Sequence, residues 1–293
     1  MDGGAAEEAL RLCLAGRISP EVALARLVLA GLRPEAIESR LRALPAAHAR
    51  ADALARLHGV QRGGLDAVRA MLAEAGLDHT DAGDGSPEAA VARVAACYDR
   101  AVAVAPEASV AAYSLNDPAV LAAATEEVVA WLAGEGLVGP DRDVLDLGCG
   151  IGRVSAALAP RCRSVLGLDV SPNMVAEARR RHGNGPRLRF ETTPGTRLTA
   201  LGAASLDLVL AVDSFPYVVQ AGAAVADRHV ADAQRVLRPR GALAILNLSY
   251  RGDLGADRAD AARWAAGGAW TLAVDGAAPF ALWDGTAFLL RRR

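Results

Sequence analysis

Two different spacings of hydrophobic side chains divide this chain of 293 residues. Up to about residue 105, apolar residues recur at helical spacing, as in Leu24, Leu27 and Val28. From residue 144 onward, short apolar runs alternate with helical patterns, which is the rhythm of parallel strands joined by helices. The pattern therefore predicts a helical N-terminal bundle over residues 1–105 and an α/β domain over residues 106–293.

Three proline-containing triplets predict where helices begin. Ser19-Pro20-Glu21 and Ser86-Pro87-Glu88 each combine an N-capping serine, a proline at the first helical position and an early acid. Arg33-Pro34-Glu35 has the proline and the acid without a good capping residue. The polar, glycine-rich segment from Asp78 to Ser86 predicts a linker. Further helices are expected over residues 47–58, 64–75, 88–104 and about 118–133.

The apolar runs after residue 140 have the length of buried strands and are bounded by glycine, proline or acidic residues. We expect strands over residues 144–147, 164–169, 188–191, 206–212, 242–247, 269–274 and 287–290, with helices over about 223–237 and 256–266. This alternation predicts a parallel sheet, although the order of its strands is not readable from the pattern. Trp283-Asp284-Gly285 predicts a turn between the last two strands.

A glycine-rich stretch follows the first predicted strand. Gly148, Gly150 and Gly152 form the pattern G-x-G-x-G, and a helical pattern begins after them. A strand–glycine turn–helix junction places unpaired backbone N–H groups of the helix beside a ligand. Arg153 stands where the dinucleotide fingerprint would need its third glycine. Asp146, two residues before the first glycine, adds a carboxylate that could bind a cationic amine.

Composition excludes several classes of function. The formal net charge is −2 and only 4% of residues are aromatic, so neither a basic surface nor a base-stacking platform indicates a nucleic-acid partner. The four cysteines are scattered, which disfavours structural zinc and disulfides and fits a reducing cytoplasm. No basic leader precedes an apolar run, and no run is long enough to span a bilayer. We therefore expect a soluble cytoplasmic protein without a metal site, a signal peptide or a membrane segment.

The set Asp146, Gly148, Gly150 and Gly152 resembles motif I of the class I S-adenosylmethionine (SAM)-dependent methyltransferases. The resemblance covers about residues 110–293. It implies a Rossmann-like, mostly parallel sheet of seven strands with flanking helices and a closing pair of strands. It also implies SAM as cofactor and transfer of a methyl group to O, N or C of a small-molecule acceptor.

The same resemblance assigns roles along the cofactor site. Asp169, at the end of the second predicted strand, would accept hydrogen bonds from the ribose hydroxyls. Val170 to Met174 resembles the start of the next helix in the family, with Met174 near the adenine. Thr192 and Thr193 stand where the family usually has an acid after the third strand. The expected cofactor-binding residues are Tyr113, Asp146, Gly148, Cys149, Gly150, Gly152, Asp169, Val170, Met174, Thr192, Thr193, Asp213 and Ser214.

The acceptor side is expected after the fourth and fifth strands. Asp213 and the following backbone would line the methionine end of SAM, while Phe215 and Tyr217 would form the acceptor pocket. Tyr250 follows the fifth strand and would face the acceptor, and His229 is the titratable candidate for a base. The expected catalytic residues are thus His229, Tyr217 and Tyr250.

Two other classes of function remain open at this point. An NAD(P)-dependent oxidoreductase could use the same fold, although the glycine spacing and the preceding acid disfavour it. A non-enzymatic interaction protein could keep a degenerate SAM site and work through its N-terminal helices. Those helices are expected to serve in homodimerisation or as a lid. A helix-turn-helix DNA reader is disfavoured because the basic residues are spread over every helix and balanced by acids.

Overall fold

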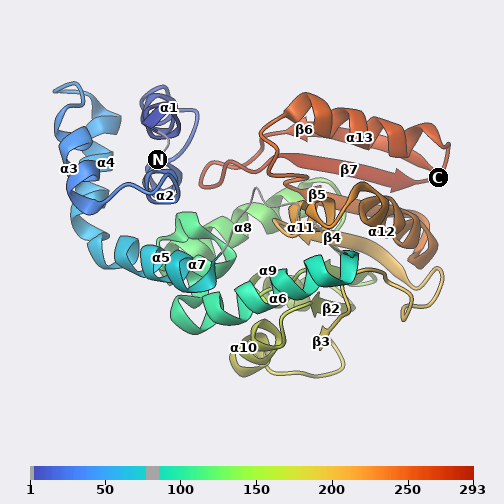
Figure 1. The fold of residues 1–293 in the computed structure, drawn as a ribbon. Helices are drawn as coiled ribbons and strands as arrows, with labels where there is room; N and C mark the ends of the chain where they lie inside the picture. Colours follow the sequence, from blue (N-terminus) through green and yellow to red (C-terminus); the bar gives the residue numbers. More distant parts are fainter. Residues whose placement is uncertain (1–2, 77–85) are drawn as a thin grey trace. The chain divides into compact units, whose positions relative to one another are not determined.

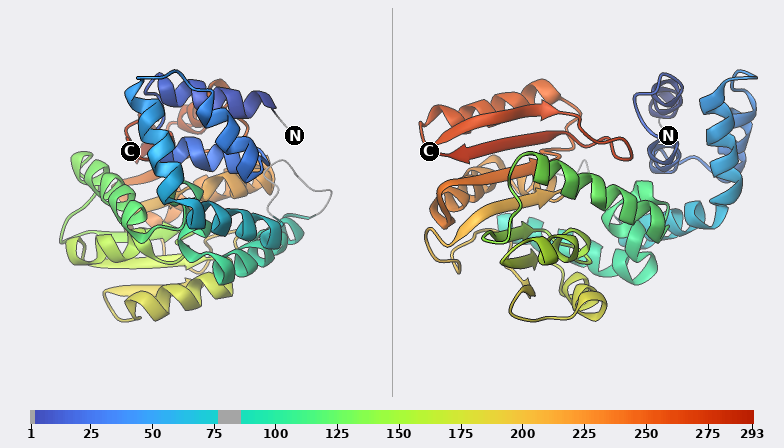
Figure 2. Two further views of the ribbon diagram at one scale, coloured as in Figure 1. Left: turned by 90° about the vertical axis from the view of Figure 1, so that its left-hand side faces the viewer. Right: turned by 180° about the vertical axis from the view of Figure 1, so that it is seen from behind.

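The computed structural model, which describes residues 3–76 and 86–293, contains one seven-stranded sheet within these residues. The strand order is β3-β2-β1-β4-β5-β7-β6, with β3 at one edge and the β6–β7 pair at the other (Figures 1 and 2). The strands are β1 (Asp143–Leu147), β2 (Ser164–Asp169), β3 (Leu188–Thr192), β4 (Leu206–Val212), β5 (Leu237–Leu246), β6 (Trp270–Ala277) and β7 (Ala287–Arg292). The predicted seven-stranded sheet is confirmed.

Pairing directions define a topological switch in the middle of the sheet. Strands β3, β2, β1, β4 and β5 are parallel, and β7 pairs antiparallel with β5 and with β6. The chain moves outward from β1 to β2 and β3, and then returns to the other side of β1 with β4. Ligands of open α/β sheets bind at such a switch, beyond the carboxyl ends of the strands. The fold thus singles out the ends of β1, β2 and β4.

Helices bury both faces of the sheet. Val230, Ala233 and Trp264 belong to the same hydrophobic cluster as Val209 and Ile245 of the central strands, so α12 and α13 cover one face. Helix α10 packs against β2 and β3. The helices after the first strand are α9 (Arg153–Leu158), α10 (Pro172–His182), α11 (Phe215–Gln220), α12 (Ala223–Val236) and α13 (Leu254–Ala266), with a 3₁₀ turn η2 (Ala159–Arg161).

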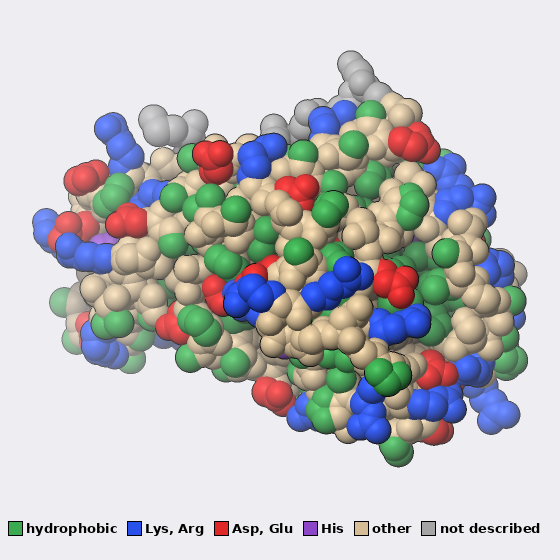
Figure 3. Space-filling model, turned by 90° about the horizontal axis from the view of Figure 1, so that it is seen from below, with side chains coloured by type: hydrophobic (Ala, Val, Ile, Leu, Met, Phe, Trp, Pro, Cys, Tyr) green, Lys and Arg blue, Asp and Glu red, His purple; other side chains and the backbone are tan. Residues whose placement is uncertain are grey.

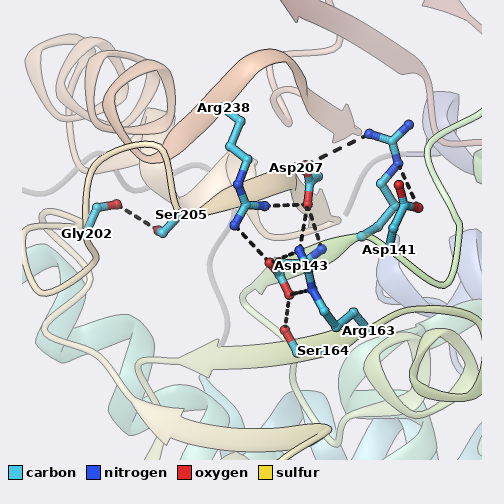
Figure 4. Close-up of polar contacts among 9 residues, drawn as sticks. Asp141, Asp143, Arg163, Ser164, Gly202, Ser205, Asp207 and Arg238 are labelled. Carbon is cyan, nitrogen blue, oxygen red and sulfur yellow. Dashed lines mark hydrogen bonds and ion pairs between the residues drawn. The ribbon is translucent and has the colours of Figure 1, made fainter.

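An ion-pair network joins the amino ends of the central strands, which lie away from the carboxyl ends that form the switch point (Figure 4). Asp143 at the start of β1 accepts hydrogen bonds from Arg163 (2.9 Å), Ser164 (2.7 Å) and Arg238 (3.0 Å). Arg238 also donates to Asp207 of β4 (2.6 Å). These contacts lower the pKa of Asp143 to about 2, chiefly through Arg163. The network is structural, since ligands bind at the carboxyl ends of the strands.

Helices dominate the residues before the sheet. They are α1 (Gly3–Leu14), α2 (Pro20–Leu29), α3 (Pro34–Arg42), α4 (Ala49–Val60), α5 (Arg62–Ala75), α6 (Pro87–Val104), α7 (Pro106–Val110) and α8 (Pro118–Gly134), with a 3₁₀ turn η1 (Ala112–Ser114). The predicted helix starts are confirmed: Ser19 accepts a hydrogen bond from the Val22 N–H (3.1 Å), and Ser86 accepts one from the Ala89 N–H (3.3 Å). The linker predicted from Asp78 lies outside the described residues.

The chain forms two compact units. The helical unit comprises Met1–Gly76, Arg100–Glu127 and Phe280–Asp284, and the sheet unit comprises Leu77–Asp99, Val128–Pro279 and Gly285–Arg293. In the helical unit, the side chains of Leu24, Leu27, Ile37, Leu54 and Met71 are buried. This division is interleaved along the chain, unlike the expected single boundary after residue 105. The domain assignment therefore stays a prediction.

Two local expectations differ from the structure. Strand β5 begins at Leu237, because Leu206 pairs with Leu237 before a register shift carries the chain past Arg238 to Ala242. The predicted turn at Trp283 is part of a longer connection in which Trp283 is buried and stacks on Phe280 (centroids 5.2 Å apart). Hydrophobic burial therefore holds this aromatic residue within the connection between β6 and β7.

Candidate functional site

Glycines bring the backbone after β1 close to two neighbouring segments. Gly148 has φ +73°, and a Cβ there would lie 2.2 Å from the Cβ of Ser214. Gly152 has φ +79°, and its Cβ would lie 2.6 Å from the ring of Phe190. Both the left-handed backbone and the close approach require glycine. The turn therefore leaves its backbone groups beside the switch point of the sheet.

Asp146 is a buried carboxylate in β1, just before this turn. Its side chain is 2% exposed, and its Oδ2 accepts a hydrogen bond from the Ser155 hydroxyl (2.6 Å) at the start of α9. Burial raises the pKa of Asp146 to about 6, against the lowering effect of that hydrogen bond and of the Arg153 charge. A carboxylate held in this way favours a cationic ligand, which would offset its desolvation.

Asp169 ends β2, the strand beside β1. Its Oδ2 accepts a hydrogen bond from the Gly150 N–H (2.8 Å), and its Oδ1 accepts one from the Ser171 N–H (2.9 Å). The neighbouring Leu168 carbonyl accepts a hydrogen bond from the Gly148 N–H (2.7 Å). Burial raises the pKa of Asp169, while those backbone donors lower it. The glycine turn and the acid of the second strand thus form one bonded assembly.

The other expected cofactor residues lie around this assembly. Met174 is 1% exposed, on α10, whose capping serine follows Val170. Cys149 is buried, and burial raises the pKa of its thiol well above the usual value, so it is a packing group within the turn. Thr192 is exposed at the end of β3, and the Thr193 N–H donates to the Asp169 carbonyl (2.9 Å).

Asp213 stands directly after β4, on the other side of β1. Its backbone is left-handed (φ +56°), which aspartate tolerates better than most residues, and its N–H donates to the Leu246 carbonyl (2.8 Å). The Asn247 side-chain amide donates to Asp213 Oδ1 (2.8 Å). The hydroxyl of the next residue, Ser214, donates to the Leu147 carbonyl before the glycine turn. Asp213 is therefore held next to the end of β1, where the glycine turn begins.

Three tyrosines from separate segments meet at Asp213, and we call them the tyrosine cluster: Tyr98, Tyr217 and Tyr250. The Tyr98 hydroxyl donates to the Tyr217 hydroxyl (2.5 Å), and the Tyr250 hydroxyl donates to Asp213 Oδ1 (3.0 Å). The Tyr217 ring stands edge-on to the other two, with centroids 5.4 Å and 5.5 Å apart. Tyr217 and Tyr250 were expected here, and Tyr98 was not.

Helix α6 also holds the segment after Asp169. The Asp99 carboxylate accepts hydrogen bonds from the Ser171 hydroxyl (2.5 Å) and the Asn173 N–H (3.0 Å) at the start of α10. A Cβ on Gly195, after β3, would lie 2.8 Å from the Val91 side chain. Sequence reasoning placed these residues in the N-terminal bundle, because helical periodicity does not say which partner a helix packs against. The adjacent polar pair Tyr98-Asp99 is the only local signal.

Two residues expected at the acceptor have other contacts. Phe215 is 1% exposed and packs edge-on against Trp264 (5.9 Å between centroids), so it belongs to the core and not to a pocket wall. His229 is 2% exposed, and its Nδ1 bonds the Val225 carbonyl one turn earlier (2.9 Å). Burial lowers the pKa of His229. Within the described residues, its Nε2 is buried and has no hydrogen-bond partner.

Tyr113 belongs to the helical unit. It is 6% exposed and stacks on Trp283, with centroids 6.3 Å apart. Its expected role in cofactor binding stays a prediction.

The two carboxylates and the glycine turn together fit one kind of ligand. Asp146 and Asp169 are both buried and are bonded to neutral hydroxyl and backbone N–H groups. Such carboxylates suit a ligand that brings its own hydroxyl donors and a positive charge. Gly148 and Gly152 let the turn pack closely against Ser214 and Phe190, which fixes its backbone beside the two carboxylates. A nucleoside that carries a cationic side arm satisfies both requirements.

Comparison with known proteins agrees with this chemistry. Residues 144–241 match the family model described as a methyltransferase domain. The chain is 31% identical over 137 residues to the S-adenosyl-L-methionine-dependent Diels-Alderase iccD of Talaromyces variabilis, covering 45% of this chain and 44% of that protein. It is 34% identical over 115 residues to the methyltransferase GfsG of Streptomyces halstedii, covering 38% and 39% respectively. The chain therefore spans less than half the length of these relatives.

A solved structure shows the same fold. Phosphoethanolamine N-methyltransferase 1 of Haemonchus contortus, in complex with phosphoethanolamine and S-adenosylhomocysteine, superposes with a TM-score of 0.54. The identity is 16%, and the match covers 73% of this chain and 51% of that one.

Proposed function

We propose that this chain, whose residues 144–241 match a methyltransferase domain, is a class I SAM-dependent methyltransferase that transfers the methyl group of SAM to a small-molecule acceptor. The observation that carries the proposal is the assembly of Asp146, Asp169 and the glycine turn at the switch point of the sheet. Its two buried carboxylates fit the cationic and hydroxyl-bearing parts of SAM.

The residues divide the cofactor between them. Asp146 and the backbone of residues 148–152 would hold the methionine part, because the buried carboxylate favours a positive charge. Asp169 would accept hydrogen bonds from the ribose hydroxyls, and Met174 and Thr193 would bind the base. SAM supplies an activated sulfonium methyl group, so the protein's part is to hold donor and acceptor in line.

Calorimetric titration with SAM and with S-adenosylhomocysteine tests the proposal. We expect the wild type to bind both, and Asp169→Ala to lose binding because it removes the acceptor of the ribose hydroxyls. Asp66→Asn is the matched control, since the Asp66 side chain is 71% exposed in the helical unit. Wild-type protein that binds neither ligand would contradict the proposal.

A second activity is supported by one comparison. The Diels-Alderase relative depends on SAM by name without being called a methyltransferase. SAM in this site could likewise serve as a bound cation that is not consumed. Release of S-adenosylhomocysteine during turnover distinguishes the two: methyl transfer produces it in step with product, and the alternative produces none. The match to a methyltransferase domain disfavours the nicotinamide-dependent alternative.

On the acceptor side, Tyr217 and Tyr250 are proposed catalytic residues, supported by their hydrogen-bonded position at Asp213. His229 is a weaker choice, because its Nδ1 is bonded within its own helix. We also propose Tyr113 as a cofactor-site residue, supported only by its place before the helix that precedes the first strand.

The helical unit is proposed as a dimerisation element. Among the described residues, the exposed large hydrophobic side chains are Leu29, Val60 and Val104, and all three belong to this unit. Light scattering on the full chain, with Val60→Glu for comparison, should show a dimer that the substitution weakens. A monomeric wild type would contradict it.

A cytoplasmic location and the absence of a nucleic-acid partner are also proposals. The four cysteines are scattered along the sequence without a C-x-x-C pair, which supports the first. For the second, Figure 3 shows arginine and acidic side chains interspersed on the face it presents, with no continuous basic surface there. In the described part of the chain, every helix is too short or too polar to cross a membrane.

A further inference from the structure

The tyrosine cluster forms a directional chain of hydrogen bonds. Tyr98 donates to Tyr217 (2.5 Å), the Tyr217 and Tyr250 hydroxyls are hydrogen-bonded to each other, and Tyr250 donates to the Asp213 carboxylate (3.0 Å). Tyr217 accepts a hydrogen bond from Tyr98, Tyr250 donates one to Asp213, and this last acceptor is the only carboxylate in the chain. Such an arrangement can pass a proton from one end to the other without moving a side chain.

The three hydroxyls keep their protons at ordinary pH. Burial raises the pKa of each of them well above the usual value. The Asp213 charge raises all three further, and the Asp169 charge on β2 also faces Tyr98. None of the tyrosines can therefore act as a resident phenolate base. They can only relay a proton to a group that is already ionised.

The relay is fixed at its carboxylate end. Asp213 follows β4 directly, and Asn247 donates to the same Oδ1 that Tyr250 uses (2.8 Å). Its neighbour Ser214 is bonded to the strand end before the glycine turn. At the other end, Tyr98 is held by α6, which Asp99 joins to the start of α10. Both ends are thus tied to segments that flank the cofactor site.

We propose that Tyr98, Tyr217 and Tyr250 relay a proton from the acceptor to the Asp213 carboxylate, and that the acceptor atom is the oxygen of an acidic hydroxyl. This rests on the proposed methyl transfer. The carbon–sulfur bond of SAM breaks with its electron pair on sulfur, and a carbon–oxygen bond forms from an oxygen lone pair. The hydroxyl proton enters at Tyr98, one proton moves along each hydrogen bond, and Asp213 ends protonated.

Relative acidity favours a phenol or an acidic enol over an alcohol or an amine. Burial raises the pKa of the three tyrosines above the ordinary phenol value of about 10, so a phenol acceptor is the stronger acid and can release its proton into the chain. An aliphatic alcohol is too weak an acid to enter this chain. A protonated amine would be better held by a carboxylate, whereas the entry group here is a neutral hydroxyl.

Single Tyr→Phe substitutions at positions 98, 217 and 250 test the relay, because each removes only one hydroxyl. The assay follows S-adenosylhomocysteine formation with 4-methylphenol and with 4-nitrophenol, which is largely ionised at the assay pH. With 4-methylphenol we expect kcat to fall about a hundredfold to ten-thousandfold. With 4-nitrophenol the variants should stay near the wild-type rate, and SAM affinity should not change. Thr125→Val, which removes a buried hydroxyl from α8, is the control.

A readout without turnover checks the same network. In Asp213→Asn, the charge that raises the three pKa values is gone, so tyrosinate absorbance should appear at lower pH than in the wild type. An unchanged titration would overturn the relay. Equal losses on both phenols would also overturn it, since they indicate a packing role. A wild type that binds SAM and methylates amines but neither phenol overturns the hydroxyl assignment, whereas failure to bind SAM overturns the proposed function beneath it.

Discussion

Replacing Asp146 by Asn should make the ligand-free protein more stable and its cofactor binding weaker. Burial raises the pKa of Asp146 from 3.8 to about 6, so the folded state holds the charged form less well than the unfolded chain does. At neutral pH that difference corresponds to about 3 kcal/mol of lost stability. Asn removes the charge but keeps only one acceptor oxygen for the two hydrogen bonds from Ser155. Loss of one hydrogen bond offsets about 1 kcal/mol of this gain, so the free energy of unfolding should rise by about 2 kcal/mol.

The sign of the pH dependence follows from the raised pKa. The penalty in the wild type is complete above about pH 6 and disappears as the pH falls toward 3.8, because the carboxyl is then protonated in both states. Urea unfolding across that range should therefore show a stability advantage of Asp146→Asn that shrinks with acidity. Asp66→Asn, at an exposed position, should show no such trend.

Cofactor binding should move the opposite way. A cationic ligand favours the ionised carboxylate, so the affinity of the wild type for SAM should fall as the pH drops below about 6. The Asn variant should bind more weakly at neutral pH and lose this dependence. An Asn variant that is less stable than the wild type at neutral pH, or that binds SAM with unchanged affinity, would refute the reasoning.

Two further substitutions test the glycine turn and the ion-pair network at the amino ends of the strands. Gly152→Ala places a Cβ 2.6 Å from the Phe190 ring on a left-handed backbone. We therefore expect urea unfolding to show a loss of about 2–4 kcal/mol in the free energy of unfolding, and calorimetry to show weaker SAM binding. Wild-type values in both measurements would contradict this expectation. Asp143→Asn should lower stability by about 2 kcal/mol at neutral pH, because the pKa of about 2 gives a contribution that is complete above 3.8 and lost as the pH falls toward 2. Its SAM affinity should not change, and a difference in stability that persists at the acid end would contradict the ion-pair explanation.

Most of the fold was predictable because its signals are local. Ser19 and Ser171 cap the helices they precede, as their position before a proline indicates. The buried strands are continuous apolar runs, so their places follow from the sequence within a few residues. The positions of the glycine turn and of Asp169 at the switch point were predictable for the same reason, since they depend on where strands end.

The rest depends on contacts between distant segments. Tyr98 and Tyr217 are 119 positions apart, and nothing in either neighbourhood indicates the other. Phe215 was assigned to the acceptor pocket from its place after β4, yet its ring is packed into the core against Trp264. The early start of β5 required the pairing of Leu206 with Leu237. Periodicity says which side chains are buried, but not which partners bury them.

The interleaving of the two units has a consequence for how this protein can be altered. Residues 280–284, close to the C-terminal strand, are part of the helical unit, where Trp283 stacks on Tyr113 and Arg26 pairs with Asp284. A fragment that ends at residue 105 lacks these residues and the segment 106–127 as well. The helical unit therefore cannot be exchanged whole by a single crossover in the gene. Any graft from a relative must carry the loop between β6 and β7 along with the N-terminal helices.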